Sequence, residues 1–219
     1  MAETKHKVFI VDDHALLRDG LAQLINQDIN FQVCGAAGDV QEALHGISDC
    51  RPDVAVIDIS LGDSSGIRLI ENLKHLYPEL AILTLSMHDE SLYAERCLKA
   101  GAMGYIMKQE PSKKVMDALR TVMKKDIYVS KNFGRKYMRM SILEESRSSH
   151  DPAECLSNRE LEVFEFMGRG FKTLEIAERL NLSVKTINTY ILHIKSKMDL
   201  KNIREVITRA AQWVAELNP

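Results

Sequence analysis

The run Val8-Phe9-Ile10-Val11 is followed at once by Asp12-Asp13, and a second run, Val54-Ala55-Val56-Ile57, is followed by Asp58. Short apolar runs that stop at a polar turn are typical of strands buried on both faces of a parallel sheet. In such sheets, ligands bind beyond the carboxyl ends of the strands. Three carboxylates at one edge would repel one another unless a cation or a proton compensated them. These runs therefore predict a Mg²⁺ site with a reactive aspartate.

The first 125 residues alternate apolar strands with amphipathic helices. The pattern predicts strands at residues 7–12, 31–36, 53–58, 81–85 and 104–107. It predicts helices at residues 15–26, 39–49, 65–77, 89–100 and 111–125. Five strand–helix units of this length favour an α/β, flavodoxin-like, doubly wound parallel sheet with the strand order 2-1-3-4-5.

The alternation ends after Lys125, which indicates a change of domain. Residues 126–153 read as a linker, with a short helix at 134–145 and a polar stretch at 146–152. Residues 154–219 show helical patterns only, with helix starts at Ser157, Lys172 and Ser183 and a last helix at 202–217. Short helices joined by tight turns are typical of a helix-turn-helix. The sequence thus predicts one domain at 1–125 and a small all-α four-helix domain at 154–219.

Composition fits a globular protein of two small domains. The chain has 219 residues, 45% of them hydrophobic and 27% charged, and a net charge of -2. It lacks an apolar run near the ~20 residues of a membrane span and an N-terminal signal-peptide pattern. The cysteines, which have no C-x-x-C spacing, indicate neither zinc nor a redox pair; they are Cys34, Cys50, Cys97 and Cys155. We therefore expect a cytoplasmic protein that does not contact membranes.

Four motifs at expected strand ends resemble the receiver domain of bacterial two-component response regulators over about residues 5–125. They are Val11-Asp12-Asp13-His14, Ile57-Asp58-Ile59, Leu85-Ser86-Met87 and Gly104-Tyr105-Ile106-Met107-Lys108. The resemblance implies a CheY-like fold and a phosphoacceptor, Asp58, that takes a phosphoryl group from a sensor histidine kinase. It implies no enzyme beyond metal-dependent self-phosphorylation and self-dephosphorylation.

The same resemblance implies a role for each polar group. Asp13 would bind Mg²⁺ (or Mn²⁺) directly and Asp12 through water, and Asp58 and the Ser60 carbonyl would complete the protein ligands. Lys108 would pair with a phosphoryl oxygen. Ser86 and Tyr105 would form the switch: the serine hydroxyl turns toward the phosphoryl group, and the tyrosine then moves inward.

Other interpretations remain open at this stage. Asp13 is in position to N-cap a helix that begins at His14, Asp58 to cap a turn, and Tyr105 to be an ordinary half-buried strand aromatic. A phosphatase that forms an aspartyl phosphate is a rival, but it needs a D-x-D spacing that Asp12-Asp13-His14-Ala15 lacks. A DNA binder with a vestigial receiver is another, and the complete set of acids, hydroxyl and lysine argues against it.

The sequence departs from common receivers at two places. The loop at 61–66 has Gly62 where many receivers have a proline turn, and Gln109 follows Lys108 where many have proline. Neither change removes a functional group, so both bear on the lifetime of the phosphoryl group and leave the site assignment unchanged.

The second half resembles the LuxR-type DNA-binding domain of NarL/FixJ response regulators over about residues 154–217. The resemblance rests on Leu156-Ser157-Asn158-Arg159-Glu160-Leu161-Glu162-Val163, Glu175-Ile176-Ala177, Leu182-Ser183-Val184-Lys185-Thr186-Ile187 and Lys197-Met198-Asp199-Leu200-Lys201-Asn202. It implies a transcription regulator that binds double-stranded DNA. Tyr190 stands where the family commonly has histidine, which leaves base preference near it open.

Helix periodicity divides the expected recognition helix into two faces. The core face holds Ile187, Ile191, Ile194 and Met198. On the opposite face, Asn188 and Thr189 can hydrogen-bond base edges, and Leu192 can contact a thymine methyl. The expected phosphate contacts are Lys172, Ser183, Lys185, Thr186 and Lys195.

Charge leaves a second interpretation of this domain open. Residues 151–219 contain ten basic and ten acidic residues, so the domain lacks the overall basic footprint of a strong nonspecific DNA binder. A solvated helix face in a protein-docking domain is the alternative. The family typically dimerises through its last helix, and we expect a homodimer when the protein is phosphorylated or bound to DNA. The apolar stripe there serves either dimerisation or the domain core; it consists of Val206, Ile207, Ala210 and Val214.

Overall fold

The computed structural model describes residues 5–61, 64–143 and 152–217. Residue contacts divide the chain into two units, Met1–Ile142 and Leu143–Pro219. These limits do not test the domain boundaries predicted from the sequence, which remain a prediction.

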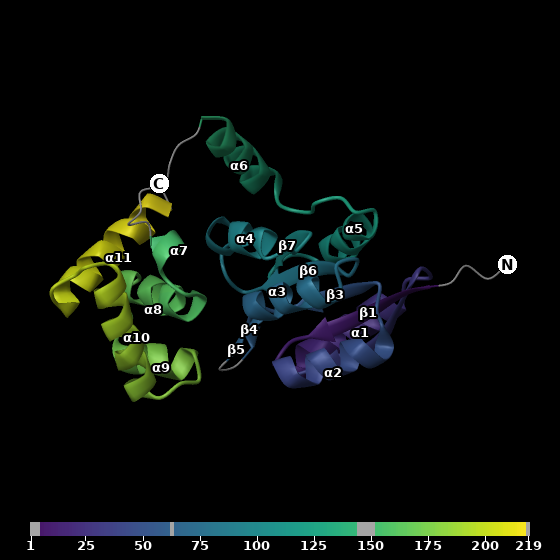
Figure 1. Ribbon diagram of the computed structural model, residues 1–219, viewed down its shortest axis with the longest axis horizontal. Coiled ribbons are helices and arrows are strands. Elements are labelled where there is room, and N and C mark those ends of the chain that lie inside the picture. The colour runs from purple at the N-terminus through teal and green to yellow at the C-terminus, as the bar shows by residue number, and fades with distance from the viewer. Residues whose placement is uncertain (1–4, 62–63, 144–151, 218–219) are drawn as a thin grey trace. The chain divides into compact units, whose positions relative to one another are not determined.

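The first unit is built on a five-stranded parallel sheet (Figure 1). Its strands are β1 (His6–Val11), β2 (Phe31–Ala37), β3 (Val54–Ile57), β6 (Ala81–Ser86) and β7 (Gly104–Met107). The spatial order is β2-β1-β3-β6-β7, which confirms the predicted flavodoxin-like order. All four residues of β3 are buried, as expected of a central strand covered on both faces.

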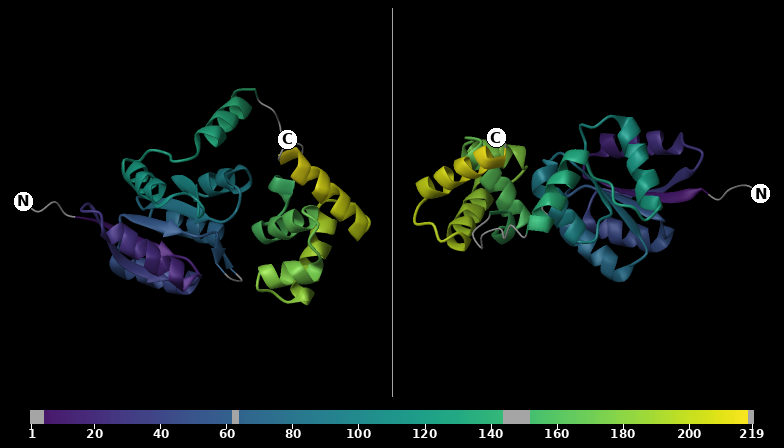
Figure 2. Two further views of the ribbon diagram at one scale, coloured as in Figure 1. Left: turned by 180° about the vertical axis from the view of Figure 1, so that it is seen from behind. Right: turned by 90° about the horizontal axis from the view of Figure 1, so that it is seen from above.

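Helices cover both faces of this sheet (Figure 2). They are α1 (Ala15–Asn26), α2 (Val40–Cys50), α3 (Gly66–Leu76), α4 (Glu90–Lys99) and α5 (Ser112–Met123). On one face, Leu21 of α1 and Leu119 of α5 share a core with Val8 and Val56. On the other, α2 packs on the Phe9 ring. Side-chain caps from Asp39 and Asp89 fix the starts of α2 and α4.

Two short strands, β4 (Ser60–Leu61) and β5 (Ser64–Ser65), follow β3 as an antiparallel pair. The sequence predicted only a loop here and a helix from residue 65, whereas α3 begins at Gly66. Gly62, which stands where many receivers have a proline turn, lies outside the described residues.

The segment after α5, predicted as the start of a linker, is hydrogen-bonded to the parallel sheet. Tyr128 bridges Gly104 in parallel; its carbonyl accepts from the Tyr105 amide at 2.9 Å, and its amide donates to the Met103 carbonyl at 2.9 Å. The Ser130 amide donates to a Glu90 carboxylate oxygen at 2.7 Å. Helix α6 (Lys131–Leu143) then starts three residues before the predicted helix, with the Ser130 hydroxyl accepting from the Phe133 amide.

The second unit consists of helices among its described residues. They are α7 (Pro152–Cys155), α8 (Asn158–Gly168), α9 (Thr173–Arg179), α10 (Val184–Lys197) and α11 (Ile203–Leu217). The four predicted helices are present, and the four-residue α7 precedes them, starting in the stretch predicted as linker and ending in the predicted second domain. Helices α8 and α11 approach closely at Gly168, where a Cβ would lie 2.5 Å from the Ala210 carbonyl oxygen. In the described part of the chain, no helix combines the length and the apolar character that crossing a membrane requires.

Candidate functional site

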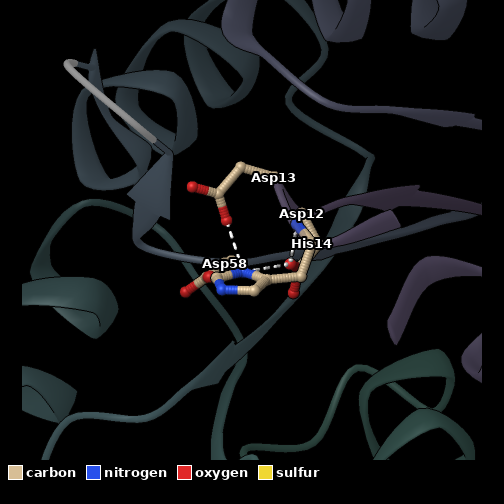
Figure 3. Close-up of side chains that lie close together, drawn as sticks. All are labelled: Asp12, Asp13, His14 and Asp58. Atoms are coloured by element: carbon tan, nitrogen blue, oxygen red, sulfur yellow. Dashed lines mark hydrogen bonds and ion pairs between the residues drawn. The ribbon is translucent and has the colours of Figure 1, made fainter. Parts of the chain in front are cut away.

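The three acidic residues of the opening motifs meet at the carboxyl edge of the sheet, as the sequence predicted. Asp12 and Asp58 leave β1 and β3, which stay paired to their ends because the Asp58 amide donates to the Val11 carbonyl at 2.8 Å. Both carboxylates are buried, whereas the Asp13 side chain is 33% exposed. One ligand atom from each of Asp12, Asp13, His14 and Asp58 lies within 4.8 Å of the others (Figure 3).

Lys108, which follows β7, supplies the positive charge that these acids need. Its Nζ lies 2.6 Å from an oxygen of Asp12 and 2.6 Å from an oxygen of Asp58, and its side chain is only 5% exposed. Burial raises the pKa of Asp58 above its usual value, although Lys108 acts against that rise. Burial acts to lower the pKa of Lys108, but the carboxylates of Asp58 and Asp12 outweigh it and raise that pKa. The lysine is therefore held as a cation between the two strand ends.

The donor set is of the kind that binds divalent metal ions. Carboxylate and main-chain carbonyl oxygens are hard ligands, which suit small divalent cations. Ser60 lies beside the acids and its amide donates to an Asp58 oxygen at 3.1 Å. The His14 ring nitrogen lies 2.6 Å from Asp13 and 3.3 Å from Asp12, between the two carboxylates (Figure 3). The sequence prediction gave this imidazole no role.

The capping interpretation of these acids is wrong for one residue and holds for another. The residue that caps α1 is His14, without a side-chain cap, so Asp13 is not the N-cap. Asp12 instead accepts from the His14 amide at 2.8 Å. Asp58 does close a turn, through the bond from Ser60, but that bond leaves its second oxygen on Lys108. Turn formation and a reactive site are thus compatible at Asp58.

The two predicted switch residues are both buried, and a histidine connects them. Ser86 is 0% and Tyr105 is 1% exposed, so Tyr105 is not a half-buried surface aromatic. The Ser86 hydroxyl accepts from the His88 amide at 3.1 Å, and the Tyr105 hydroxyl donates to the His88 carbonyl at 2.9 Å. Burial raises the pKa of Tyr105 well above its usual value, so it stays a neutral donor. In this structure Tyr105 already occupies the inward position.

Sequence reasoning missed His88. Its Nε2 lies 2.8 Å from the Ser60 hydroxyl, and this bond joins the loop after β3 to the loop after β6. Its ring also packs against Tyr93, with centroids 4.6 Å apart. A single histidine two residues after Ser86 carries no sequence signal of this bond, because the bond depends on two loops meeting in space.

In the second unit, α10 has the two faces that periodicity predicted. Ile187, Ile191 and Ile194 are buried. Asn188, Thr189 and Leu192 are exposed, with Leu192 at 60%. Of the expected phosphate contacts, Lys172, Ser183 and Lys185 are exposed, and Thr186 and Lys195 are half-buried. The Ser183 hydroxyl caps α10 by accepting from the Thr186 amide at 3.0 Å. Their DNA contacts remain a prediction.

A buried acid holds the recognition helix to α8. Glu160, with a side chain 4% exposed, accepts from Lys197 of α10 at 2.6 Å and from the Ser157 amide at 2.7 Å. Burial acts to raise the pKa of Glu160, but the hydrogen bonds from Lys197 and Ser157 outweigh it and lower that pKa. The predicted capping-box residue thus also ties the C-terminal end of α10 to the start of α8.

We expect Glu160→Gln to lower the free energy of unfolding of the full chain's second unit by about 1–2 kcal/mol at neutral pH, because an amide accepts more weakly than a carboxylate from an ammonium group. Since the folded-state pKa of Glu160 is below the ordinary 4.5, its stabilising effect is present above that value and is lost as the pH falls through the folded pKa. Urea denaturation of both proteins at a series of pH values measures this. Substitution of the exposed Glu178 by glutamine serves as the control. A difference in the free energy of unfolding between wild type and Glu160→Gln that stayed the same at all pH values would contradict the prediction.

The sequence matches two families, one over each half. Residues 8–120 match the response regulator receiver domain, and residues 154–210 match the bacterial regulatory proteins of the luxR family. The chain is 35% identical over 209 residues to the oxygen regulatory protein NreC of Staphylococcus epidermidis, covering 93% of this chain and 96% of that protein. It is 33% identical over 208 residues to NreC of Staphylococcus carnosus, with the same coverage.

Solved structures agree in fold. The response regulator RcsB of Salmonella typhimurium superposes with a TM-score of 0.63 at 24% identity, covering 96% of this chain and 98% of that one. RcsB bound to the promoter rprA with the phosphomimetic BeF3- gives 0.60 at 24% identity, covering 95% and 99%. The response regulator ChrA of a heme-sensing two-component system gives 0.51 at 26% identity, covering 95% and 97%.

Proposed function

Because the chain belongs to the two-component response regulators that join a receiver domain to a LuxR-type DNA-binding domain, we propose that a sensor histidine kinase phosphorylates it on Asp58 and that this controls dimerisation and DNA binding. The observation that carries the proposal is the placement of Lys108 within 2.6 Å of both Asp12 and Asp58, beside Asp13. This gives two buried carboxylates, the cation between them and a further acidic side chain at a single edge of the sheet. The proposed setting is the cytoplasm.

In the proposed reaction, an Asp58 carboxylate oxygen attacks the phosphorus of a phosphohistidine, and the bond between phosphorus and the imidazole nitrogen breaks. Asp12, Asp13, Asp58 and the Ser60 carbonyl would hold Mg²⁺ (or Mn²⁺), which offsets the charge on the phosphoryl oxygens when bound. Lys108 moves from the carboxylates to a phosphoryl oxygen as a second counter-charge. Loss of the group to water would reverse the modification, and the protein catalyses no other reaction.

The proposed output runs from the switch residues to DNA. Turning the Ser86 hydroxyl toward the phosphoryl group would break its hydrogen bond with the His88 amide. The loop after β6 that contains His88 would then shift, and with it the hydrogen bonds that His88 makes to Tyr105 and Ser60. Such a change in the loop before α4 alters the balance between two receiver states, and coupling requires that these states differ in their contacts. A dimer then places two α10 helices on successive half-sites.

The last helix divides the predicted apolar stripe between core and surface. Val206 and Ala210 are fully buried within the unit, which makes them core residues. Ile207 is 44% exposed and Val214 is half-buried. Any dimer contact through α11 is therefore proposed for the Ile207 and Val214 side only.

A beryllofluoride titration tests the proposal on the full chain. With Mg²⁺ present, we expect tighter binding to promoter DNA flanking the protein's own gene and a rise in molecular mass toward a dimer. Unchanged DNA affinity and mass at saturating beryllofluoride would contradict the proposal and favour a vestigial receiver. Binding of beryllofluoride without any DNA binding would instead favour the protein-docking interpretation of the second unit.

Truncation of Asn188, an exposed polar side chain of the recognition helix, should weaken specific binding. For Asn188→Ala we expect roughly a tenfold to hundredfold loss of affinity for the operator, because a bidentate contact to a base is worth about 1–3 kcal/mol. Fluorescence anisotropy with operator and scrambled DNA measures the change. Gln212→Ala, exposed on α11, is the matched control. Equal losses on both DNAs would show that Asn188 does not read bases.

A further inference from the structure

Strand β2 contains an irregularity centred on a cysteine. In the pairing with β1, Val8 faces Val33 while Phe9 faces Gly35, so Cys34 is the extra residue of a bulge. A bulged residue leaves the regular ladder, and its backbone groups need other partners. The Cys34 carbonyl finds one in the Cys50 thiol, whose sulfur donates to it at 3.0 Å.

Two glycines bring this second cysteine to the bulge. A Cβ on Gly35 would lie 2.6 Å from the Phe9 ring and 3.2 Å from the Cys50 sulfur. A Cβ on Gly46 of α2 would likewise lie 2.6 Å from the Phe9 ring. Helix α2 therefore packs on β1 and β2 with only the Phe9 ring between Gly46 and Gly35. This close approach places Cys50, the last residue of α2, against the bulge.

The two thiols also lie close enough for Cys50 to affect the ionisation of Cys34. Both residues are half-buried, so small solutes reach them more readily than the fully buried Cys97. Burial, together with the bond to Cys50, raises the pKa of Cys34 to about 11. Its thiolate is therefore scarce near neutral pH, and the pair should react slowly with oxidants.

We propose that Cys34 and Cys50 form a dithiol site that a hydroperoxide oxidises to an intramolecular disulfide. In the first step, one thiol loses its proton, its sulfur attacks a peroxide oxygen, and the O–O bond breaks to leave a sulfenic acid and water. In the second step, the other sulfur attacks the sulfenic sulfur, and the oxygen leaves as water. Overall, two thiols and one hydrogen peroxide give one disulfide and two waters. The sequence spacing indicated no redox pair, because residues 34 and 50 are brought together only by the fold.

The disulfide would join the end of α2 to the strand next to β1. It would close a loop between residues 16 positions apart in the sequence, which restricts the unfolded chain. Strand β2 also holds the backbone of the acidic site, because the Ala37 carbonyl accepts from the Asp12 amide at 3.1 Å. We therefore expect the oxidised receiver to unfold at a higher temperature than the reduced one. The inference does not depend on phosphorylation.

Hydrogen peroxide treatment of the reduced full-length protein tests the site, with long incubation and slightly alkaline pH to offset the scarce thiolate. We expect the loss of two hydrogen atoms in the intact mass, a cross-linked peptide pair containing residues 34 and 50, and two fewer thiols open to alkylation, all reversed by dithiothreitol. Cys34→Ala and Cys50→Ala should each abolish the cross-link and the rise in melting temperature. Cys155→Ala, in the other unit, should leave both unchanged.

A second measurement keeps the proposal testable if a variant folds poorly. Phenylarsine oxide binds two neighbouring thiols, so the reduced wild-type protein should bind one equivalent that peroxide treatment removes. Failure of the wild type to form the 34–50 cross-link, with both thiols still open to alkylation or separately oxidised to sulfinic acid, would overturn the proposal.

Discussion

Replacing Asp58 with asparagine is expected to abolish covalent phosphorylation by a small-molecule donor such as acetyl phosphate. The amide cannot attack phosphorus, and no neighbouring carboxylate occupies the same place: Asp12 is turned toward its own loop by the bond from the His14 amide. The phosphoryl-dependent gains in dimerisation and DNA affinity should vanish with it. Intact-mass measurement after donor treatment reports the covalent step, and analytical ultracentrifugation reports the dimer.

The control for this substitution is Asp49→Asn, which removes an exposed acid of α2 from the same unit. It should accept the phosphoryl group as the wild type does. Acceptance by Asp58→Asn at the wild-type rate, on any residue, would refute the assignment of the acceptor. Acceptance at a much lower rate on Asp12 or Asp13 would leave it intact, because neighbouring carboxylates can react weakly once the preferred nucleophile is gone.

Of the glycine-to-alanine substitutions in the receiver, Gly66→Ala should reduce the stability of the fold the most. A Cβ there would lie 2.1 Å from the Asp58 carbonyl oxygen and 2.6 Å from the Ile59 Cα. Both neighbours are backbone atoms, so relief requires moving either the start of α3 or the acceptor loop itself. We expect the free energy of unfolding to fall by about 3 kcal/mol, the upper part of the usual range for overpacking. The phosphorylation rate should fall as well, since the displaced loop carries Asp58 and Ser60.

Gly20→Ala provides the matched comparison, because no atom lies within 4 Å of the position where its Cβ would stand. In the interior of α1, this change should stabilise the protein by about 0.4–1 kcal/mol and leave phosphorylation unaffected. Chemical denaturation of both variants measures the free energy of unfolding, and the rate of phosphorylation by acetyl phosphate measures the effect on the site. A Gly66→Ala protein with wild-type stability would show that the acceptor loop yields to the methyl group, contrary to the expectation.

The sequence predicted the fold where local pattern and tertiary structure agree. Apolar runs located the five strands of the receiver sheet, and helix periodicity located the helices around it. The strands β4 and β5 escaped prediction because two residues each are too few to show an alternating pattern. Helix α7 was not predicted either, because four residues are too few to show a helical periodicity.

The candidate site was predictable only as far as it follows strand ends. Asp12, Asp58 and Lys108 were found because each directly follows an apolar run, and parallel strands bring such positions together. The bond between His88 and Ser60 joins residues 28 apart in sequence, and the bond between Lys197 and Glu160 joins residues 37 apart. No local pattern encodes such pairs, because they arise from packing between elements.

The bridge between Tyr128 and β7 constrains how two receivers can associate. An outer strand with open backbone groups is a template for pairing with another chain. Here the Tyr105 amide and the Met103 carbonyl are already bonded to the protein's own backbone. The segment around Tyr128, which leads away from the sheet, thus covers part of the open edge of β7. A receiver dimer that continued the sheet across β7 would first have to displace this segment, so at this edge association through side-chain surfaces is favoured.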